Sequence, residues 1–342
     1  MELAKLMRIA ETLDRLMSMD IPARGISGIL YEAAREKAGR PLTLAAAELL
    51  QAAIRPGANV IIATGWVDQP VVAPGYGESD GPPGAVALAR ALRLSLKAAP
   101  IIVTDECLVE GVKQIARAAG FQCVRPGELI HSIERNKLMT IAVVPFAADE
   151  EAARRQAAEM IASLKPAACV AIERGGMNDA EIVHNMAGQS TGEGQAKIDY
   201  LFRAAGAAGV ATLGIGDGGN EIGMANIADA VRRRVPHGAK CQCPCGGGIA
   251  AATPVDVLVA AAVSNWGAYA VAALLGLSAG VPAAVHDPAM ERRVLEATAA
   301  ACFHDPITGL LMPGADGCGL DVHIGMAALL KEAVLQGQAR YK

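Results

Sequence analysis

The stretch VATLGIGDGGNEIGMANIADAV, residues 210–231, predicts a buried strand, then a glycine-rich loop with acidic side chains, then the start of a helix. Asp217 and Glu221 follow the strand directly. In open parallel α/β sheets, ligands bind outside the carboxyl ends of the strands, where loops vary while strands and helices hold them in place. The stretch therefore predicts an α/β fold with carboxylates at the edge of the sheet where ligands bind.

The rest of the chain continues this alternation of strand and helix. Apolar, β-rich runs lie at residues 59–63, 100–103, 139–144, 168–172, 210–215 and 255–263, and helical patterns lie at 84–97, 106–119, 150–164, 196–208 and 265–276. Such alternation is typical of a mostly parallel sheet flanked by helices in Rossmann-like layers. We expect a helical segment over residues 1–55, packed on the core, and an α/β domain over 56–342, built as one unit or as two intimately joined subdomains.

Composition narrows the class of protein. A chain of 342 residues with 52% hydrophobic content can bury a large core. Its 31 basic and 35 acidic residues are mixed along the sequence, so we expect neither nucleic acid nor membrane as a partner, and a small anionic ligand fits better. Eight scattered cysteines predict reduced thiols and a cytoplasmic protein. The alanine-rich helices, with exposed apolar surface, predict a homo-oligomer.

Acidic residues follow four of the predicted strands, and their convergence is the strongest functional signal. The four strand ends are followed by Asp68, by Asp105 and Glu106, by Glu173 with Arg174, and by Asp217 with Glu221. Carboxylates that meet in one cleft repel one another unless a divalent cation or a proton relieves the charge. Hard oxygen ligands favour Mg²⁺ or Mn²⁺. The predicted metal ligands are Glu78, Asp80, Glu173, Asp217 and Glu221.

Several of these acids have an equally simple structural explanation. Asp80 precedes two prolines at a helix start, which also suits an N-cap residue. Asp105 opens a helix, where negative charge favours the positive end of the helix dipole. Glu173 precedes Arg174, which allows a structural ion pair. Asp217 is harder to explain this way, because the glycines around it let the backbone approach a ligand closely.

Three other motifs carry weaker signals. Gly214, Gly216 and Gly219 have the spacing of a dinucleotide fingerprint, but Asp217 inside the turn would repel a pyrophosphate. The run CQCPC, residues 241–245, has C-x-C-x-C spacing and not the paired C-x-x-C spacing of structural zinc, and no fourth ligand is nearby except His237. We therefore favour a glycine-rich turn with small thiols over a zinc or iron–sulfur site. His184 is either a proton-transfer residue near the predicted cleft or an ordinary hydrogen-bonded histidine.

Five collinear motifs together resemble one known family. They are ESDGPPGA at 78–85, VTDE at 103–106, ERGGMND at 173–179, GIGDGGNEIGM at 214–224 and TPVDVLVAAAVSNWGAY at 253–269. Over roughly residues 40–335 the chain resembles the D-glutamate cyclase C-terminal-domain family. The resemblance implies a lyase that converts D-glutamate to 5-oxo-D-proline and water, with a divalent metal held by acidic residues. In larger mitochondrial members this region follows a hydro-lyase-like domain, so the resemblance also implies a separate hydro-lyase-like partner protein.

The chemistry of lactam formation suits such a site, because the amine and the carboxyl group are already joined by a short tether. Under this hypothesis a metal on Asp217, Glu221 and Glu173 polarises the γ-carboxylate of a small anionic amino acid. The expected proton-transfer residues are Asp105, Glu106 and His184. Arg174 would hold the α-carboxylate, and Asn220 is a further catalytic candidate. The same cleft also suits a metal-dependent phosphoester hydrolase, another lactam-forming or lactam-opening enzyme, or a metal- or ligand-binding assembly module without turnover.

Overall fold

The computed structural model describes residues 3–135, 137–192 and 194–339, and in these residues seven parallel strands form one sheet. The strands lie in the order β3-β4-β2-β1-β5-β6-β7. Their bounds are β1 Asn59–Thr64, β2 Ala99–Asp105, β3 Gln122–Cys123, β4 Thr140–Phe146, β5 Ala168–Ile172, β6 Ala211–Gly216 and β7 Val257–Ala260. The predicted parallel α/β fold is confirmed, although the last strand is shorter than the apolar run at 255–263.

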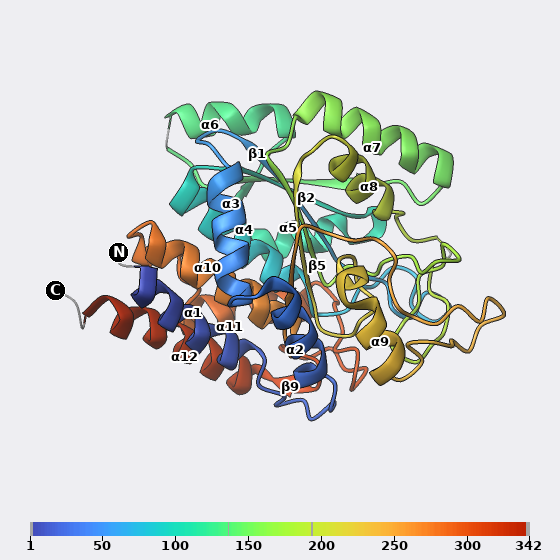
Figure 1. The fold of residues 1–342 in the computed structure, drawn as a ribbon. Coiled ribbons are helices and arrows are strands. Elements are labelled where there is room, and N and C mark those ends of the chain that lie inside the picture. Colours follow the sequence, from blue (N-terminus) through green and yellow to red (C-terminus); the bar gives the residue numbers. More distant parts are fainter. Residues whose placement is uncertain (1–2, 136, 193, 340–342) are drawn as a thin grey trace.

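Helices cover the sheet on both sides (Figure 1). Their bounds are α1 Leu3–Met17, α2 Ser27–Ala38, α3 Leu42–Ala53, α4 Pro82–Leu96, α5 Val109–Ala118, α6 Leu129–Arg135, α7 Glu150–Leu164, α8 Asp199–Ala207, α9 Ala228–Arg234, α10 Ser264–Ser278, α11 Pro288–Ala300 and α12 Leu320–Ala339. The remaining elements are short 3₁₀ turns and one hairpin. The turns are η1 Glu106–Leu108, η2 Pro126–Glu128, η3 Met224–Ile227 and η4 Pro282–Ala284, and the hairpin pairs β8 Gly314–Ala315 with β9 Cys318–Gly319. In Figure 1, α1, α11 and α12 lie together at the lower left, and α7 lies beside α8 at the upper right.

The central strands are apolar because both of their faces are covered. β2 and β5 are buried along their whole length, as is typical of parallel sheets between two helical layers. Helix α10 is buried over nearly all of its length and packs against α4. The small residues of both helices allow this close approach, since a Cβ added at Gly84 would lie 3.0 Å from the Cβ of Ala268.

The strand order places a crevice at the carboxyl end of β1. The chain runs from β1 to β2 on one side and later returns to form β5 on the other side of β1. At such a switch point the loops after neighbouring strands diverge, and ligands bind between them. Thr64 of β1 is level with Ile172 of β5, which is level with Ile215 of β6, so the loops after these three strands leave the sheet at one edge.

The N-terminal helices pack onto the same core. α2 and α3 contact β7, and α1 contacts α10 and α12. The loop between α1 and α2 brings Arg24 to the carboxyl edge of the sheet, where its side chain reaches Asp217. The division of the chain into units at residue 55 stays a prediction. Among the described helices, none combines the length and the apolar character needed to cross a membrane.

Candidate active site

A cavity of about 230 Å³ opens at the carboxyl edge of the sheet. Its lining consists of Arg24, Trp66, Asp68, Gln69, Glu78, Glu173, Asn185, Met186, Ala187, Asp217, Asn220, Pro306, Ile307 and Asp316. The carboxylates come from the loops after β1, β5 and β6 and from the turn between β8 and β9. Three of the five predicted metal ligands, Glu78, Glu173 and Asp217, therefore line the same cavity.

Asp217 and Asp80 are held together by the start of helix α10. The backbone N–H of Ser264 donates to Asp80 Oδ2 at 2.8 Å and to Asp217 Oδ2 at 2.9 Å. Asp80 also accepts a hydrogen bond from the backbone N–H of Asn265 at 2.9 Å. Both carboxylates thus satisfy free N–H groups at the positive end of a helix. Asp80 does act as a cap, but of α10 and not of the helix α4 that follows it, because α4 has no side-chain cap.

Glu221 shapes the loop that presents Asp217. Its carboxylate accepts hydrogen bonds from the backbone N–H groups of Asp217 at 2.8 Å, Gly218 at 2.5 Å and Gly219 at 2.7 Å. Gly219 has a φ of 104°, a conformation that costs glycine little. The carboxylate of Glu221 is therefore buried behind the loop, and Asp217 supplies the carboxylate of this motif that lines the cavity.

Glu173 and Glu78 also line the cavity. Glu173 has a φ of 43°, which is uncommon for a residue with a side chain, and its Oε2 accepts a hydrogen bond from Ser264 Oγ at 2.6 Å. Glu78 is buried, and its Oε1 has no hydrogen-bond partner among the described residues. The same is true of Asp316 Oδ2, from which Arg24 Nη1 lies 3.7 Å away. Buried oxygens without partners are costly, so a cation, a proton or a ligand is expected beside them.

Electrostatics in the cavity favour neutralisation of these acids. Burial, reinforced by repulsion from neighbouring carboxylates, raises the pKa of Glu78, Asp80, Glu173 and Asp316 well above the ordinary range. Burial lowers the pKa of Arg24, but Asp217 and Asp316 outweigh it and raise that pKa overall. Among the described residues that line the cavity, Arg24 is the one basic side chain, and it does not balance five carboxylates.

Two groups of carboxylates are close enough to share a cation. One consists of Asp80, Asp217 and Asp316, and the other of Glu173, Asp217 and Glu221. Within each group one oxygen from each residue lies within 4.8 Å of the others. All-oxygen sites of this kind suit hard divalent cations such as Mg²⁺ and Mn²⁺. Asp217 belongs to both groups, so it is the residue that either arrangement of a cation would share.

Asp105 and Arg174 lie beside each other, away from the cavity lining. Arg174 is buried and forms an ion pair with Asp105, and its Nη2 donates to the carbonyl of Ala196 at 2.6 Å. Asp105 Oδ1 accepts a hydrogen bond from the Ala196 backbone N–H at 2.6 Å. The expected structural ion pair of Arg174 exists, but with Asp105 instead of Glu173. Glu106 begins η1 and is exposed.

His184 faces cysteines, not the acidic cavity. Its Nε2 lies 3.1 Å from Cys243 Sγ, and its Nδ1 lies 3.1 Å from the carbonyl of Ile182. The expectation that His237 is the histidine nearest the thiols is corrected, because the group that can hold a metal contains His184 with the three cysteines. Asn220 connects the two regions, since it lines the cavity and donates from Nδ2 to the His184 carbonyl at 2.8 Å.

Sequence reasoning missed several residues of the site. Arg24 and Asp316 come from the two ends of the chain and carry no local motif. The sequence pattern identified Asp68 as an acid that follows β1, but it did not identify His304 as the partner of Asp68. His304 Nε2 lies 2.9 Å from Asp68 Oδ1, and this contact raises the pKa of His304.

The fold and the cavity define an α/β protein with a buried acidic site at the carboxyl edge of a parallel sheet. Residues 13–331 match the family described as "D-glutamate cyclase-like, C-terminal", and the chain belongs to that family. It is 33% identical over 203 residues to the human protein named "D-glutamate cyclase, mitochondrial". This match covers 58% of the chain and 29% of the human protein, so the chain spans less than a third of that relative. The resemblance inferred from the five motifs is confirmed.

Proposed function

We propose that this chain is a metal-dependent lyase that cyclises D-glutamate to 5-oxo-D-proline and water in the acidic cavity. The observation that carries the proposal is the cluster of buried carboxylates around Asp217, with too little positive charge to neutralise it. Membership of the D-glutamate cyclase-like family and the name of the human relative support the substrate. A phosphoester substrate is less favourable, because a phosphate would add negative charge beside five carboxylates and one arginine.

The residues of the cavity fit a divalent cation. The donors are carboxylate oxygens, and the unpartnered Asp316 Oδ2 is close to the Asp217 carboxylate. We assign Asp217 as the central ligand, supported by Asp316 and Glu173, which also line the cavity. Asp80 and Glu221 lie behind them and complete either group. When bound, Mg²⁺ or Mn²⁺ supplies a Lewis acid that polarises a substrate carboxylate and offsets the charge of the site.

The chain's own groups account for binding and proton transfer. In the reaction the amino nitrogen forms a bond to the γ-carboxyl carbon, a carbon–oxygen bond breaks, and two protons leave the nitrogen with the departing oxygen as water. Glu78 Oε1 has no partner among the described residues and is suited to accept an ammonium proton. Asn220 Oδ1, also buried and unpartnered there, is suited to accept an N–H of the substrate. Since both residues line one small cavity, they would hold the amine in a fixed orientation.

The remaining predicted residues receive different roles in this proposal. We assign Asp105 and Arg174 as positioning residues, because their ion pair joins the loops after β1, β2 and β5 through Gly65 and Ala196. His184 positions Asn220 through its carbonyl. Glu106 is exposed, and we give it no part in the chemistry.

The test is detection of 5-oxoproline by mass spectrometry from the purified, metal-stripped chain given D- or L-glutamate, with and without added Mn²⁺ or Mg²⁺. We expect metal-dependent product from D-glutamate above spontaneous cyclisation. Asp217→Asn should abolish it, whereas Asp229→Asn, an exposed acid on α9, should leave it intact. Product at the spontaneous rate with every metal would contradict the proposal, and turnover of a generic phosphoester instead would assign the cavity to hydrolysis.

The partners and the compartment stay predictions. A homo-oligomer, a separate hydro-lyase-like partner protein, a cytoplasmic location, and the absence of nucleic-acid and membrane partners all belong to the proposal. Size-exclusion chromatography with light scattering, at several protein concentrations, tests the oligomer directly.

A further inference from the structure

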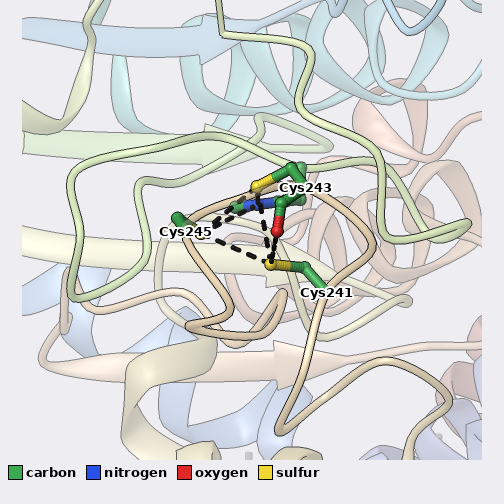
Figure 2. A group of neighbouring side chains, drawn as sticks. Cys241, Cys243 and Cys245 are labelled. Carbon is green, nitrogen blue, oxygen red and sulfur yellow. Dashed lines mark hydrogen bonds between the residues drawn. The ribbon is translucent and has the colours of Figure 1, made fainter.

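Three thiols and one imidazole meet in a loop beside the acidic cavity. Figure 2 shows the side chains of Cys241, Cys243 and Cys245 turned toward one another. Their sulfurs are separated by 3.5 Å between Cys241 and Cys243 and by 3.3 Å for each of the other two pairs. His184 Nε2 lies 3.1 Å from Cys243 Sγ and 3.6 Å from Cys245 Sγ. All four ligand atoms lie within 4.8 Å of one another.

These distances suit a tetrahedral metal and not a disulfide. Zinc holds thiolates at about 2.3 Å, which separates the sulfurs of a tetrahedron by roughly 3.8 Å. The observed separations of 3.3–3.5 Å therefore need only a small outward movement to admit the ion. They are much longer than a sulfur–sulfur bond of about 2.05 Å, and all three cysteines are free.

Hydrogen bonds to His184 and Cys245 favour the forms of these side chains that bind a metal. The Nδ1–H of His184 is 3.1 Å from the Ile182 carbonyl, and donation there leaves the lone pair of Nε2 directed at the thiols. Cys245 Sγ accepts hydrogen bonds from the backbone N–H of Gly247 at 3.4 Å and from Asn178 Nδ2 at 3.6 Å. Donors of this kind stabilise a thiolate, which is the form that binds metal.

We propose that His184, Cys241, Cys243 and Cys245 bind a structural Zn²⁺ ion. Three soft sulfurs and one imidazole select zinc over the hard cations that suit the carboxylate cavity. Four protein ligands fill a tetrahedron and leave no position for a substrate, which is the mark of a structural site. The zinc site is thus distinct in its ligands and in its role from the metal site proposed at Asp217.

Such an ion would hold together two segments that have little regular structure. The cysteines lie in residues 236–256, where the structure contains neither helix nor strand, and His184 belongs to the loop after β5. The next residues of that loop, 185–187, line the acidic cavity, and the carbonyl of His184 orients Asn220. Zinc therefore fixes one wall of the cavity without contacting its contents.

The first test is the metal content of the purified full chain by mass spectrometry. We expect about one zinc per chain, lost in Cys243→Ser and in His184→Ala. Cys107→Ser is the matched control, because Cys107 is exposed and lies outside the cluster. A chain purified without zinc that also fails to take it up at equimolar concentration would overturn the proposal, as would iron in its place.

The second test needs no variant and so does not depend on whether the variants fold. Thiol titration of the native chain should show three additional reactive thiols after a chelator removes the ion, and added Zn²⁺ should protect them again. Mn²⁺ or Mg²⁺ should not protect them, because these ions prefer oxygen ligands. Co²⁺ should give the visible absorption of tetrahedral thiolate coordination. Equal thiol reactivity before and after chelation would contradict the site, whatever the result of the cyclase assay.

Discussion

Arg24 and Asp217 form a salt bridge of 2.8 Å between Nη2 and Oδ1, although 193 positions separate them in the sequence. The same guanidinium donates to the backbone carbonyls of Asp217 at 3.2 Å and Ala262 at 2.9 Å. One side chain therefore connects the N-terminal helices to the loop after β6 and to the start of α10. The acidic site depends on a residue that lies outside every motif of the sequence.

Replacing this arginine tests whether it stabilises the acidic loop. Arg24→Met leaves the buried Asp217 without its cationic partner. We expect a loss of about 3 kcal/mol in the free energy of unfolding, since removing one partner leaves an uncompensated charge buried. Urea unfolding of the metal-free chain measures it. Arg55→Met, at an exposed helix end, should change stability by less than about 0.5 kcal/mol. Equal stability of the two variants would show that the salt bridge contributes nothing.

The ion pair of Arg174 with Asp105 gives a second test, which separates a structural role from substrate binding. We expect Arg174→Met to destabilise the chain by about 3–5 kcal/mol, because both partners are buried. Asp105→Asn should have a similar effect, and the double variant should lose less than the sum. The measurement is urea unfolding of the four proteins. A variant of Arg174 with unchanged stability and a raised KM for D-glutamate would instead restore the substrate-binding role predicted from sequence.

Substitution of Gly81 by alanine tests how closely the backbone packs around the site. It has a φ of 98°, and a Cβ there would lie 2.8 Å from Thr64 Oγ1 and 2.9 Å from Glu173 Cβ. Gly39 has a φ of 65° and open space around it. Alanine at Gly39 costs about 1–2 kcal/mol from the left-handed backbone. Gly81 has a ψ of -65°, which lies outside the left-handed α region, so a side chain there is strained at least as much. Gly81→Ala alone should displace Glu173 and reduce turnover by about tenfold or more, so equal activity of the two variants would contradict the assigned role of Glu173.

The contact between His304 and Asp68 predicts a pH dependence of stability. The hydrogen bond to Asp68 raises the pKa of His304 above 6.5, although burial opposes it. The folded chain therefore binds this proton more tightly than the unfolded chain. The resulting stability is fully present below the unfolded pKa and is lost as pH rises through the folded one.

We accordingly expect His304→Gln to lower the melting temperature more at about pH 5.5 than at about pH 8.5. Differential scanning calorimetry of wild type and variant at both pH values gives the comparison. His131→Gln, on the exposed surface of α6, should show no such difference. A His304 variant whose effect is the same at both pH values, or larger at the higher one, would rule out this contact as a source of stability.

Local patterns in the sequence were sufficient to predict most strands of the sheet. The apolar runs at 59–63, 100–103 and 168–172 became β1, β2 and β5, because a strand buried on both faces needs a continuous apolar run. β3 was not predicted, since two residues at the edge of the sheet carry no such run. Helices α11 and α12 were also missed, although α11 begins with an N-cap Asp287 followed by proline.

The position of an acid at a strand end could be predicted, but the direction of its side chain could not. Glu78, Glu173 and Asp217 reach the cavity because parallel strands end at one edge, which is a property of the sequence order of strands and helices. Asp105 also ends a strand, yet it turns to Arg174, because the loop from β5 to α8 brings Ala196 over it.

The sequence by itself determined the parallel α/β fold, the family, and the edge at which the acids gather, because each rests on local periodicity or on a contiguous motif. Only the tertiary structure decided that Arg24 pairs with Asp217, that Asp316 joins the cavity, and that His184 faces the thiols. These contacts join segments from different parts of the chain. They are set by the packing of loops across the carboxyl edge of the sheet, and no local pattern of residues encodes that packing.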